Sequence, residues 1–305
     1  GLISPRSVVR SHFPLPIIMI RHILRTTRLI PIYFFINLRR YLSEKKIIKK
    51  SDNDLLNFGF VKFKSQKGKQ IKEYLSEVIE NPLNAENSKL GKFKILKTNN
   101  YGVKTIAVDA CSEFLHKYVF IDEILNKLKN YYGKEFYLRN NPTIEFNYEN
   151  EVNDAQFFHL DYCAKQTSVM INLNSINSTS THMEYIKKTN KKYRFRIPNR
   201  EDKKTIEEID KISHKYEIAK TTGEIGDISI FDAGTGFHRQ VSGGKRIMLH
   251  LNFTENLAHT GWKNNWDPKD YDYWFSSGEN NLNKNLFKLV TKKLKPSFLT
   301  PRIYC

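Results

Sequence analysis

Alternating apolar and polar positions fill the middle and later parts of the chain, and this two-residue period predicts short β-strands. The clearest case is the segment 246–252, in which Arg246, Met248 and His250 share one face and the intervening Ile and Leu residues form the other. Earlier segments have the spacing of amphipathic helices instead. The predicted strands cover residues 92–97, 104–108, 136–138, 143–148, 167–173, 183–186, 228–231 and 247–253, and the predicted helices cover residues 70–80 and 112–132.

Helical segments come early and strands come late, which favours an antiparallel β-sandwich or barrel with helical buttresses. Residues 54–63 add a short helix, a glycine turn and a strand. A charged stretch at 199–215 predicts a helical insertion, and residues 286–294 predict a final helix behind an aromatic-rich irregular tail. With 40% hydrophobic residues and no low-complexity linker, residues 51–305 are expected to form one globular domain, mainly β with flanking helices.

The formal net charge of +18 is concentrated at the N-terminus. Residues 1–50 contain eleven Arg and Lys residues and a single acid, Glu44, and so carry a net charge of +10. We therefore expect residues 1–50 to be a basic extension ahead of the domain. Between Ile17 and Ile30 apolar residues recur at helical spacing with arginines between them. This pattern is compatible with peripheral membrane contact through residues 13–50, with an organellar targeting segment, and with a helix packed on the domain.

The number and spacing of the cysteines indicate the redox state of the cellular compartment. The three cysteines have no CxxC spacing and no even count, which favours a reducing compartment and excludes a disulfide scaffold. The expected location is therefore the cytoplasm, with membrane or organelle association if the basic extension directs it there.

A second basic cluster lies at residues 187–204, a segment that contains nine Lys and Arg residues and only two acids. Such a cluster is compatible with a solvated loop and with contact to an anionic substrate. Nucleic acid is disfavoured as a partner, because no dense aromatic and basic surface accompanies the candidate metal residues described next.

Candidate metal ligands come from two separate segments. His159 and Asp161 are two residues apart in strand-like sequence, so their side chains are expected to point to the same side. His238 follows a later strand and is expected to complete the set from a facing strand. Two histidines and one carboxylate on one side of an ion leave the other positions open, as non-haem Fe(II) requires when it binds a cosubstrate and O2. The alternative for His238 is a hydrogen-bonded structural histidine, and the pair His182/Glu184 is a rival motif of the same spacing.

Arg246 follows a tight Ser-Gly-Gly turn and opens the alternating strand. An arginine that enters a barrel interior is costly unless a carboxylate meets it. A bidentate salt bridge to a dicarboxylate cosubstrate would satisfy Arg246, whereas the alternative is an arginine at the surface or at an element end.

Several of these segments together resemble the Fe(II)/2-oxoglutarate-dependent dioxygenases, and the phytanoyl-CoA dioxygenase-like branch is the most similar. The resemblance covers roughly residues 52–255, with an opening strand at 57–61. It implies a double-stranded β-helix, or jelly-roll, core. The segments that carry it are residues 157–161, 168–174, 183–186 and 226–231, followed by His238 and Arg246.

By this resemblance His159, Asp161 and His238 would be the iron ligands, and Arg246 would bind the distal carboxylate of 2-oxoglutarate. No catalytic residue beyond the metal ligands is implied. The interval from His238 to Arg246 is short for the family, which leaves Lys245 as an alternative anchor. The family often has Ser where Met248 stands. The pair His182/Glu184 would be structural or would face the substrate.

The expected function is hydroxylation of an unactivated C–H bond in a small, anionic substrate, with consumption of O2 and release of succinate and CO2. Fe(II) and 2-oxoglutarate are the expected cofactor and cosubstrate, and ascorbate is a further candidate. The carboxylate Asp161 favours hydroxylation over halogenation, because related halogenases lack it. The alternative from another class is a catalytically inactive β-helix protein that binds a ligand or a membrane.

Overall fold

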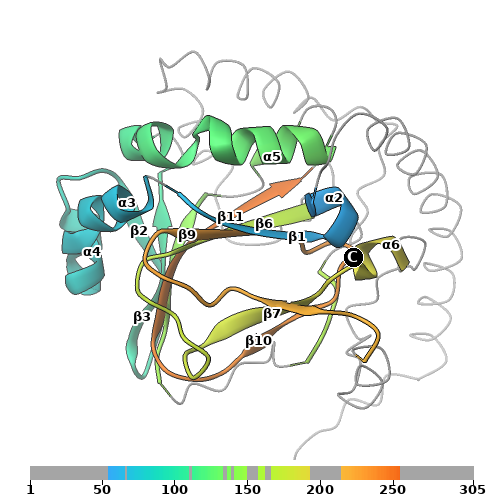
Figure 1. Ribbon diagram of the computed structural model, residues 1–305. Helices are drawn as coiled ribbons and strands as arrows, with labels where there is room; N and C mark the ends of the chain where they lie inside the picture. Colours follow the sequence, from blue (N-terminus) through green and yellow to red (C-terminus); the bar gives the residue numbers. More distant parts are fainter. Residues whose placement is uncertain are drawn as a thin grey trace, which may run out of the picture.

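The computed structural model describes residues 54–65, 67–109, 112–132, 136–138, 141–149, 157–161, 166–192 and 214–254. These residues form two antiparallel sheets (Figure 1). The large sheet has the order β1-β9-β6-β11-β5-β3-β2, and β4 pairs with β11. Its strands are β1 (Phe60–Lys64), β2 (Phe93–Asn99), β3 (Gly102–Val108), β4 (Tyr137–Leu138), β5 (Thr143–Asn147), β6 (Gln166–Asn172), β9 (Asp227–Asp232) and β11 (Arg246–Thr254). The small sheet has the order β10-β7-β8, with β7 (His182–Ile186), β8 (Ile218–Lys220) and β10 (His238–Val241).

The helices lie around the large sheet. In Figure 1, α5 runs along one side of this sheet, while β7 and β10 lie on the opposite side. The helical elements are α2 (Asp54–Phe58), α3 (Gly68–Tyr74), α4 (Ser76–Glu80), the 3-10 turn η1 (Pro82–Asn87), the π-turn η2 (Leu115–Val119), α5 (Asp122–Tyr132) and α6 (Thr189–Lys192).

The predicted alternation along β11 is confirmed. Ile247, Leu249 and Leu251 belong to the main core beneath the helices, whereas Met248 belongs to a second cluster with Met170 and Tyr185. Because Tyr185 lies on β7, this second cluster fills the space between the two sheets. The fold class predicted from the sequence, mainly β with flanking helices, is therefore confirmed.

The predicted strands on either side of His238, residues 228–231 and 247–253, are not direct neighbours in the structure. The strands β9 and β11 do not pair with each other, because β6 lies between them in the large sheet. Between them the chain leaves the large sheet, forms β10 in the small sheet and returns. The crossing begins at a turn in which Thr235 N–H donates to Asp232 Oδ1 (3.1 Å) and Gly236 N–H donates to Asp232 O (3.1 Å). This movement between sheets puts His238 on a strand of its own.

The two predicted helices are both interrupted. The segment 112–132 divides into η2 and α5, since Phe120 N–H bonds to Leu115 O (2.7 Å) in a π-type turn and a new helix starts with the acidic pair Asp122 and Glu123. The segment 70–80 divides at Leu75 into α3 and α4. Leu75 is buried in the main core at this junction.

Several predictions lie outside the described residues. They are the basic extension 1–50, the tail after residue 254 with its final helix, and most of the charged segments 187–204 and 199–215. No helix within the described ranges is long and apolar enough to cross a membrane.

Candidate metal centre

His159 and His238 are direct neighbours in the structure. They form an antiparallel bridge in which each backbone N–H donates to the carbonyl of the other residue, at 2.9 and 3.1 Å. The sequence predicted a facing strand for His238, but the bridge extends the small sheet so that the two histidines lie side by side. Asp161 follows the bridge, and its N–H donates to Ala233 O (2.9 Å), just before the turn that leads to β10. Backbone contacts thus bring together two segments that are far apart in the sequence.

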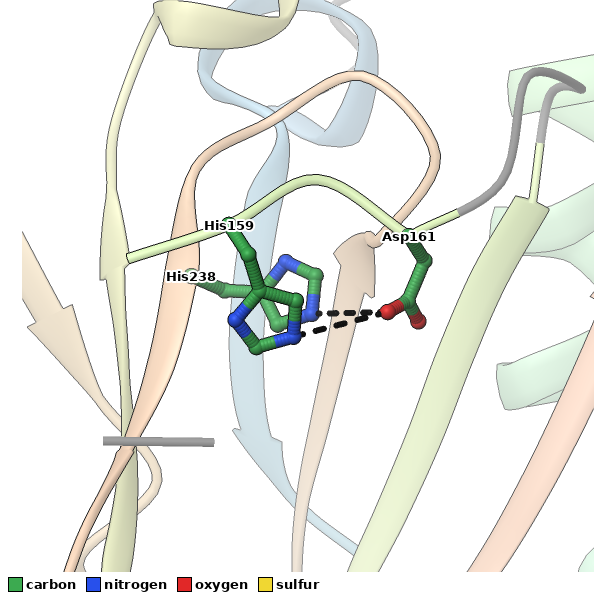
Figure 2. Close-up of side chains that lie close together, drawn as sticks. All are labelled: His159, Asp161 and His238. Carbon is green, nitrogen blue, oxygen red and sulfur yellow. Dashed lines mark ion pairs between the residues drawn. The ribbon is translucent and has the colours of Figure 1, made fainter. Parts of the chain in front are cut away.

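The three side chains converge on one point (Figure 2). Asp161 Oδ1 lies 3.6 Å from His159 Nε2 and 3.5 Å from His238 Nε2. One potential ligand atom from each of the three residues lies within 4.8 Å of the other two. Ligand atoms about 2.1 Å from one ion at right angles lie about 3 Å apart, so small side-chain rotations would close these distances around a metal.

Each imidazole is held by a backbone carbonyl two residues earlier. His159 Nδ1 lies 2.8 Å from Phe157 O, and His238 Nδ1 lies 3.1 Å from Gly236 O. A carbonyl can only accept, so each Nδ1 carries a hydrogen, and each Nε2, which faces Asp161, is the nitrogen that would bind a metal once it carries no proton. Metal-binding histidines are commonly oriented in this way. The donor set therefore fits a transition metal such as iron.

One side of the donor set is open to solvent. His238 is buried beside the ring of Phe231 (centroids 5.4 Å apart), whereas the His159 and Asp161 side chains are 25% and 30% exposed. Burial acts to raise the pKa of Asp161, but the imidazoles of His238 and His159 outweigh it and hold that pKa well below its usual range. The carboxylate is thus ionised and available as a ligand.

The loop before His238 requires glycine at Gly236. A Cβ built there would lie 1.7 Å from Tyr185 Oη and 2.2 Å from Tyr185 Cζ, on a ring that is itself buried. The next residue, Phe237, donates its N–H to Thr189 Oγ1 (3.0 Å). Close packing against Tyr185 and this bond fix the approach of the chain to His238.

Arg246 points into the space between the sheets and is 1% exposed. Its Nε and Nη2 donate to Asn147 Oδ1 (2.9 and 2.7 Å), and Nη2 also donates to Gln240 Oε1 (3.0 Å). Its Nη1 is buried and has no hydrogen-bond partner. Burial lowers the pKa of Arg246 to about 10, opposed by the charge of Glu145, so the guanidinium stays charged at neutral pH. Lys245 is exposed, which leaves Arg246 as the inward-facing cation.

Arg246 and the three donor residues face one space. Gln240 lies two residues beyond His238 on β10, about 7 Å along the strand. His238 and Gln240 pair with Tyr185 and Met183, which belong to the cluster between the sheets. Since Gln240 bonds to Arg246, the guanidinium is separated from the histidines by roughly this strand distance. The sequence did not single out the two amides, Asn147 and Gln240, because a polar residue in a strand gives no sign of what it meets.

The rival pair His182/Glu184 lies elsewhere. Glu184 pairs in register with Arg239 and Lys220, and the alternation along β7 puts it on the side opposite to Tyr185. Arg239 forms two bonds to Glu184 Oε2 (2.9 and 2.7 Å), and Lys220 Nζ lies 3.2 Å from Glu184 Oε1. The carboxylate is thus occupied by two cations, and the pair is structural.

Comparison with known proteins adds information on the fold. No family model and no curated protein matches the sequence. The crystal structure of EctD from S. alaskensis with bound Fe matches with a TM-score of 0.50 at 12% identity, covering 66% of this chain and 74% of that chain. EctD with 2-oxoglutarate and 5-hydroxyectoine gives a TM-score of 0.49 at 12% identity, covering 66% and 73%. SnoN, a non-heme alpha ketoglutarate dependent epimerase from nogalamycin biosynthesis, gives 0.46 at 13% identity, covering 75% and 93%.

At these identities the likeness establishes the fold alone. It identifies the two-sheet core as a double-stranded β-helix, or jelly roll, as the sequence predicted.

Proposed function

We propose that this protein is an Fe(II)- and 2-oxoglutarate-dependent oxygenase. The observation that carries the proposal is the shared space between the sheets, which holds a His-Asp-His donor set and a buried, incompletely bonded arginine. Both features suit a bound group: the three donor side chains converge on one point, and the arginine buries a charge that has one nitrogen without a hydrogen-bond partner. A metal would satisfy the first, and a dicarboxylate that reaches from the metal to the arginine would satisfy the second.

In this proposal His159 and His238 bind iron through Nε2, and Asp161 binds it through its carboxylate. When bound, iron would supply activation of O2, and 2-oxoglutarate would supply two electrons as it is decarboxylated to succinate and CO2. The residues of the chain hold the metal ligands in position. The Phe157 and Gly236 carbonyls keep both imidazoles in the ligand tautomer, and the turn before His238 sets its distance from His159.

Arg246 would bind the distal carboxylate of 2-oxoglutarate. Its Nη1 donates to one oxygen, while Asn147 and Gln240 hold the other nitrogens and fix the plane of the guanidinium. Burial strengthens the ion pair and makes a carboxylate the preferred partner. The separation of Gln240 from His238 along β10 is one that a five-carbon dicarboxylate can bridge.

The reaction we propose is hydroxylation of a small substrate that approaches from the solvent-exposed side of His159 and Asp161. A carboxylate ligand at Asp161 occupies the position that a halide would need, which favours hydroxylation over halogenation. On its sequence motifs we place the chain in the phytanoyl-CoA dioxygenase-like branch, with ascorbate as an auxiliary reductant. An anionic substrate is proposed from the basic cluster at 187–204.

The test is 2-oxoglutarate binding and turnover by the purified protein. With Fe(II), ascorbate and O2 we expect slow release of succinate even without the primary substrate, and metal-dependent binding of 2-oxoglutarate by calorimetry. Asp161→Ala should abolish the metal dependence, and Arg246→Gln should weaken 2-oxoglutarate by about 100-fold, since a buried charged hydrogen bond is worth roughly 3 kcal/mol.

Lys245→Gln is the matched control, because Lys245 is adjacent in sequence but exposed. Its affinity for 2-oxoglutarate should equal that of the natural chain. If the natural chain fails to bind 2-oxoglutarate in the presence of metal, or if Asp161→Ala binds it equally well, the proposal is wrong and a non-catalytic β-helix protein becomes the better interpretation.

A further inference from the structure

Glu145 lies between two partners on the inner face of the large sheet. In the pairing of β11 with β5, Arg246 is opposite Asn147, Met248 is opposite Glu145, and His250 is opposite Thr143. Glu145 is therefore a diagonal neighbour of both Arg246 and His250. Diagonal neighbours across an antiparallel pair lie about 7–8 Å apart, within reach of long side chains. The backbone alone allows Glu145 to bond to either residue.

In the structure Glu145 bonds to His250. His250 Nδ1 donates to Glu145 Oε1 at 2.7 Å, and Thr143 Oγ1 donates to the same oxygen at 3.5 Å. Arg246 forms no ion pair with any carboxylate in the described ranges, and its bonds go to the amide oxygens of Asn147 and Gln240. The acid nearest to Arg246 in the register is thus turned toward the other end of β11.

A shift of Glu145 to Arg246 would be favourable on charge alone. A carboxylate and a guanidinium form stronger bonds than a carboxylate and an imidazole, and the pair would satisfy the buried Nη1. The two groups already interact through space, since Arg246 lowers the pKa of Glu145 and Glu145 opposes the lowering of the pKa of Arg246. The same shift would place an internal carboxylate where the distal carboxylate of 2-oxoglutarate is proposed to bind.

We propose that His250 is a positioning residue that holds Glu145 away from Arg246 and so keeps Nη1 open for the cosubstrate. This inference rests on the proposed function, because it concerns the carboxylate site at Arg246. The neutral amides support it. Asn147 and Gln240 orient the guanidinium without neutralising it, so both nearby positions that contact Arg246 avoid negative charge.

The experiment measures the dissociation constant of 2-oxoglutarate by calorimetry, with Mn(II) in place of Fe(II) to prevent turnover. His250→Phe removes the donor to Glu145 and should weaken 2-oxoglutarate about tenfold, because the freed carboxylate competes for Arg246. Glu145→Gln should bind 2-oxoglutarate at least as tightly as the natural chain, since an amide competes less well. The double variant His250→Phe/Glu145→Gln should regain the affinity of Glu145→Gln. His250→Gln retains an N–H donor and should stay near the natural affinity.

The double variant separates positioning from packing. If it binds as weakly as His250→Phe, the effect of His250 comes from packing and the inference is wrong. It is also wrong if His250→Phe binds like the natural chain while Arg246→Gln loses binding, a result that leaves the proposed function intact. Failure of the natural chain to bind 2-oxoglutarate would instead reject the proposed function and the inference together. Thermal unfolding of each variant confirms that the fold persists.

Discussion

At Arg246 the sequence places a charge in the interior and surrounds it with neutral acceptors. Asn147 accepts two of its hydrogen bonds and Gln240 accepts a third. A buried cation without a counter-ion is costly, and a protein selected for stability alone would be expected to have a carboxylate here. In the proposed function, the amides leave the charge of Arg246 free to pair with an external anion.

Asn147→Asp tests this interpretation with a nearly isosteric change. The new carboxylate would receive the bonds from Arg246 Nε and Nη2 and neutralise the guanidinium. We expect the fold to be retained and the affinity for 2-oxoglutarate to fall by at least about tenfold, as measured by calorimetry. Asn252→Asp is the control, because Asn252 lies on the same face but bonds to Ser168 (2.9 Å). Equal losses in both variants would show that any added acid weakens binding and would contradict the specific role of Asn147.

The lowered pKa of Glu184 predicts how the stability of the fold changes at acidic pH. The imidazole of His182 and the cations Arg239 and Lys220 lower its pKa from 4.5 to about 2, against the effect of burial. At 3.9 Å from the carboxylate, His182 Nε2 is too far for a good hydrogen bond, so we assign most of the effect to Arg239. Because the folded-state pKa is the lower one, the unfolded chain takes up the proton first. The stabilisation is complete above pH 4.5 and is lost as the pH falls toward 2.

Glu184→Gln should therefore reduce the free energy of unfolding at pH 7 by about 1.5–3 kcal/mol, the range for hydrogen bonds to charged groups. Urea unfolding of both proteins should show this difference shrinking between pH 4.5 and pH 2. Glu217→Gln is the control: its ion pair with Lys187 is at the surface, where the Glu217 side chain is 72% exposed, and it should have little effect. A difference that stays constant across this pH range would exclude ionised Glu184 as the cause.

At the scale of elements, Gly236 in the loop between β9 and β10 differs from Gly244 after β10. Gly236 touches the buried ring of Tyr185, and an added Cβ has no space there. A Cβ at Gly244 would have its nearest neighbours at 3.7 and 3.8 Å, which is ordinary contact. Only the first position links the packing of the small sheet to the placement of His238.

Gly236→Ala should destabilise the fold by about 1–3 kcal/mol through overpacking and should also weaken metal binding, because the displaced loop carries His238. The free energy of unfolding comes from urea titration, and the metal affinity comes from calorimetry with Mn(II). Gly244→Ala should change stability by less than about 0.5 kcal/mol. If Gly236→Ala lowers stability and leaves metal affinity unchanged, the loop is needed for packing alone.

The sequence predicted the strands better than their partners. Strand positions and the two faces of β11 follow from local alternation, which needs no knowledge of the rest of the chain. The sheet to which a strand belongs depends on contacts with distant segments, so the sequence did not show that β10 lies in the small sheet. The short strand β8 was missed, because its three residues are too few to show a period.

The same limit applies to the candidate site. His159, Asp161, His238 and Arg246 could be named because their spacing and the surrounding motifs resemble those of the Fe(II)/2-oxoglutarate-dependent dioxygenases. Glu184 lies on the side of β7 where it pairs with Arg239 and Lys220. The two-residue spacing of His182 and Glu184 gives no information about these partners. Asn147 and the Glu145–His250 pair emerge only from the register of strands separated by about a hundred residues, and Gln240 emerges from the place of β10 in the small sheet.

For the whole molecule, the distribution of charge divides the chain into two parts. Residues 1–50 carry +10 of the formal net charge of +18, and the domain that contains the candidate site follows them. A basic, apolar segment gains about 1 kcal/mol for each Lys or Arg near an anionic membrane surface. We therefore propose that residues 13–50 bring the domain that contains the candidate site to such a surface, and that the two parts act independently.

Charge reversal tests this proposal in the full chain. We expect the natural protein to sediment with vesicles of phosphatidylcholine and phosphatidylserine and to remain in solution with phosphatidylcholine alone. The triple variant R21E/R25E/R28E should weaken binding to the anionic vesicles by about 100-fold or more, since each reversal removes roughly 1 kcal/mol of attraction and adds repulsion. Its affinity for 2-oxoglutarate should be unchanged if the two parts are independent. Equal sedimentation of the two proteins would contradict a membrane role for these arginines, and a parallel loss of 2-oxoglutarate binding would indicate that the extension supports the domain instead.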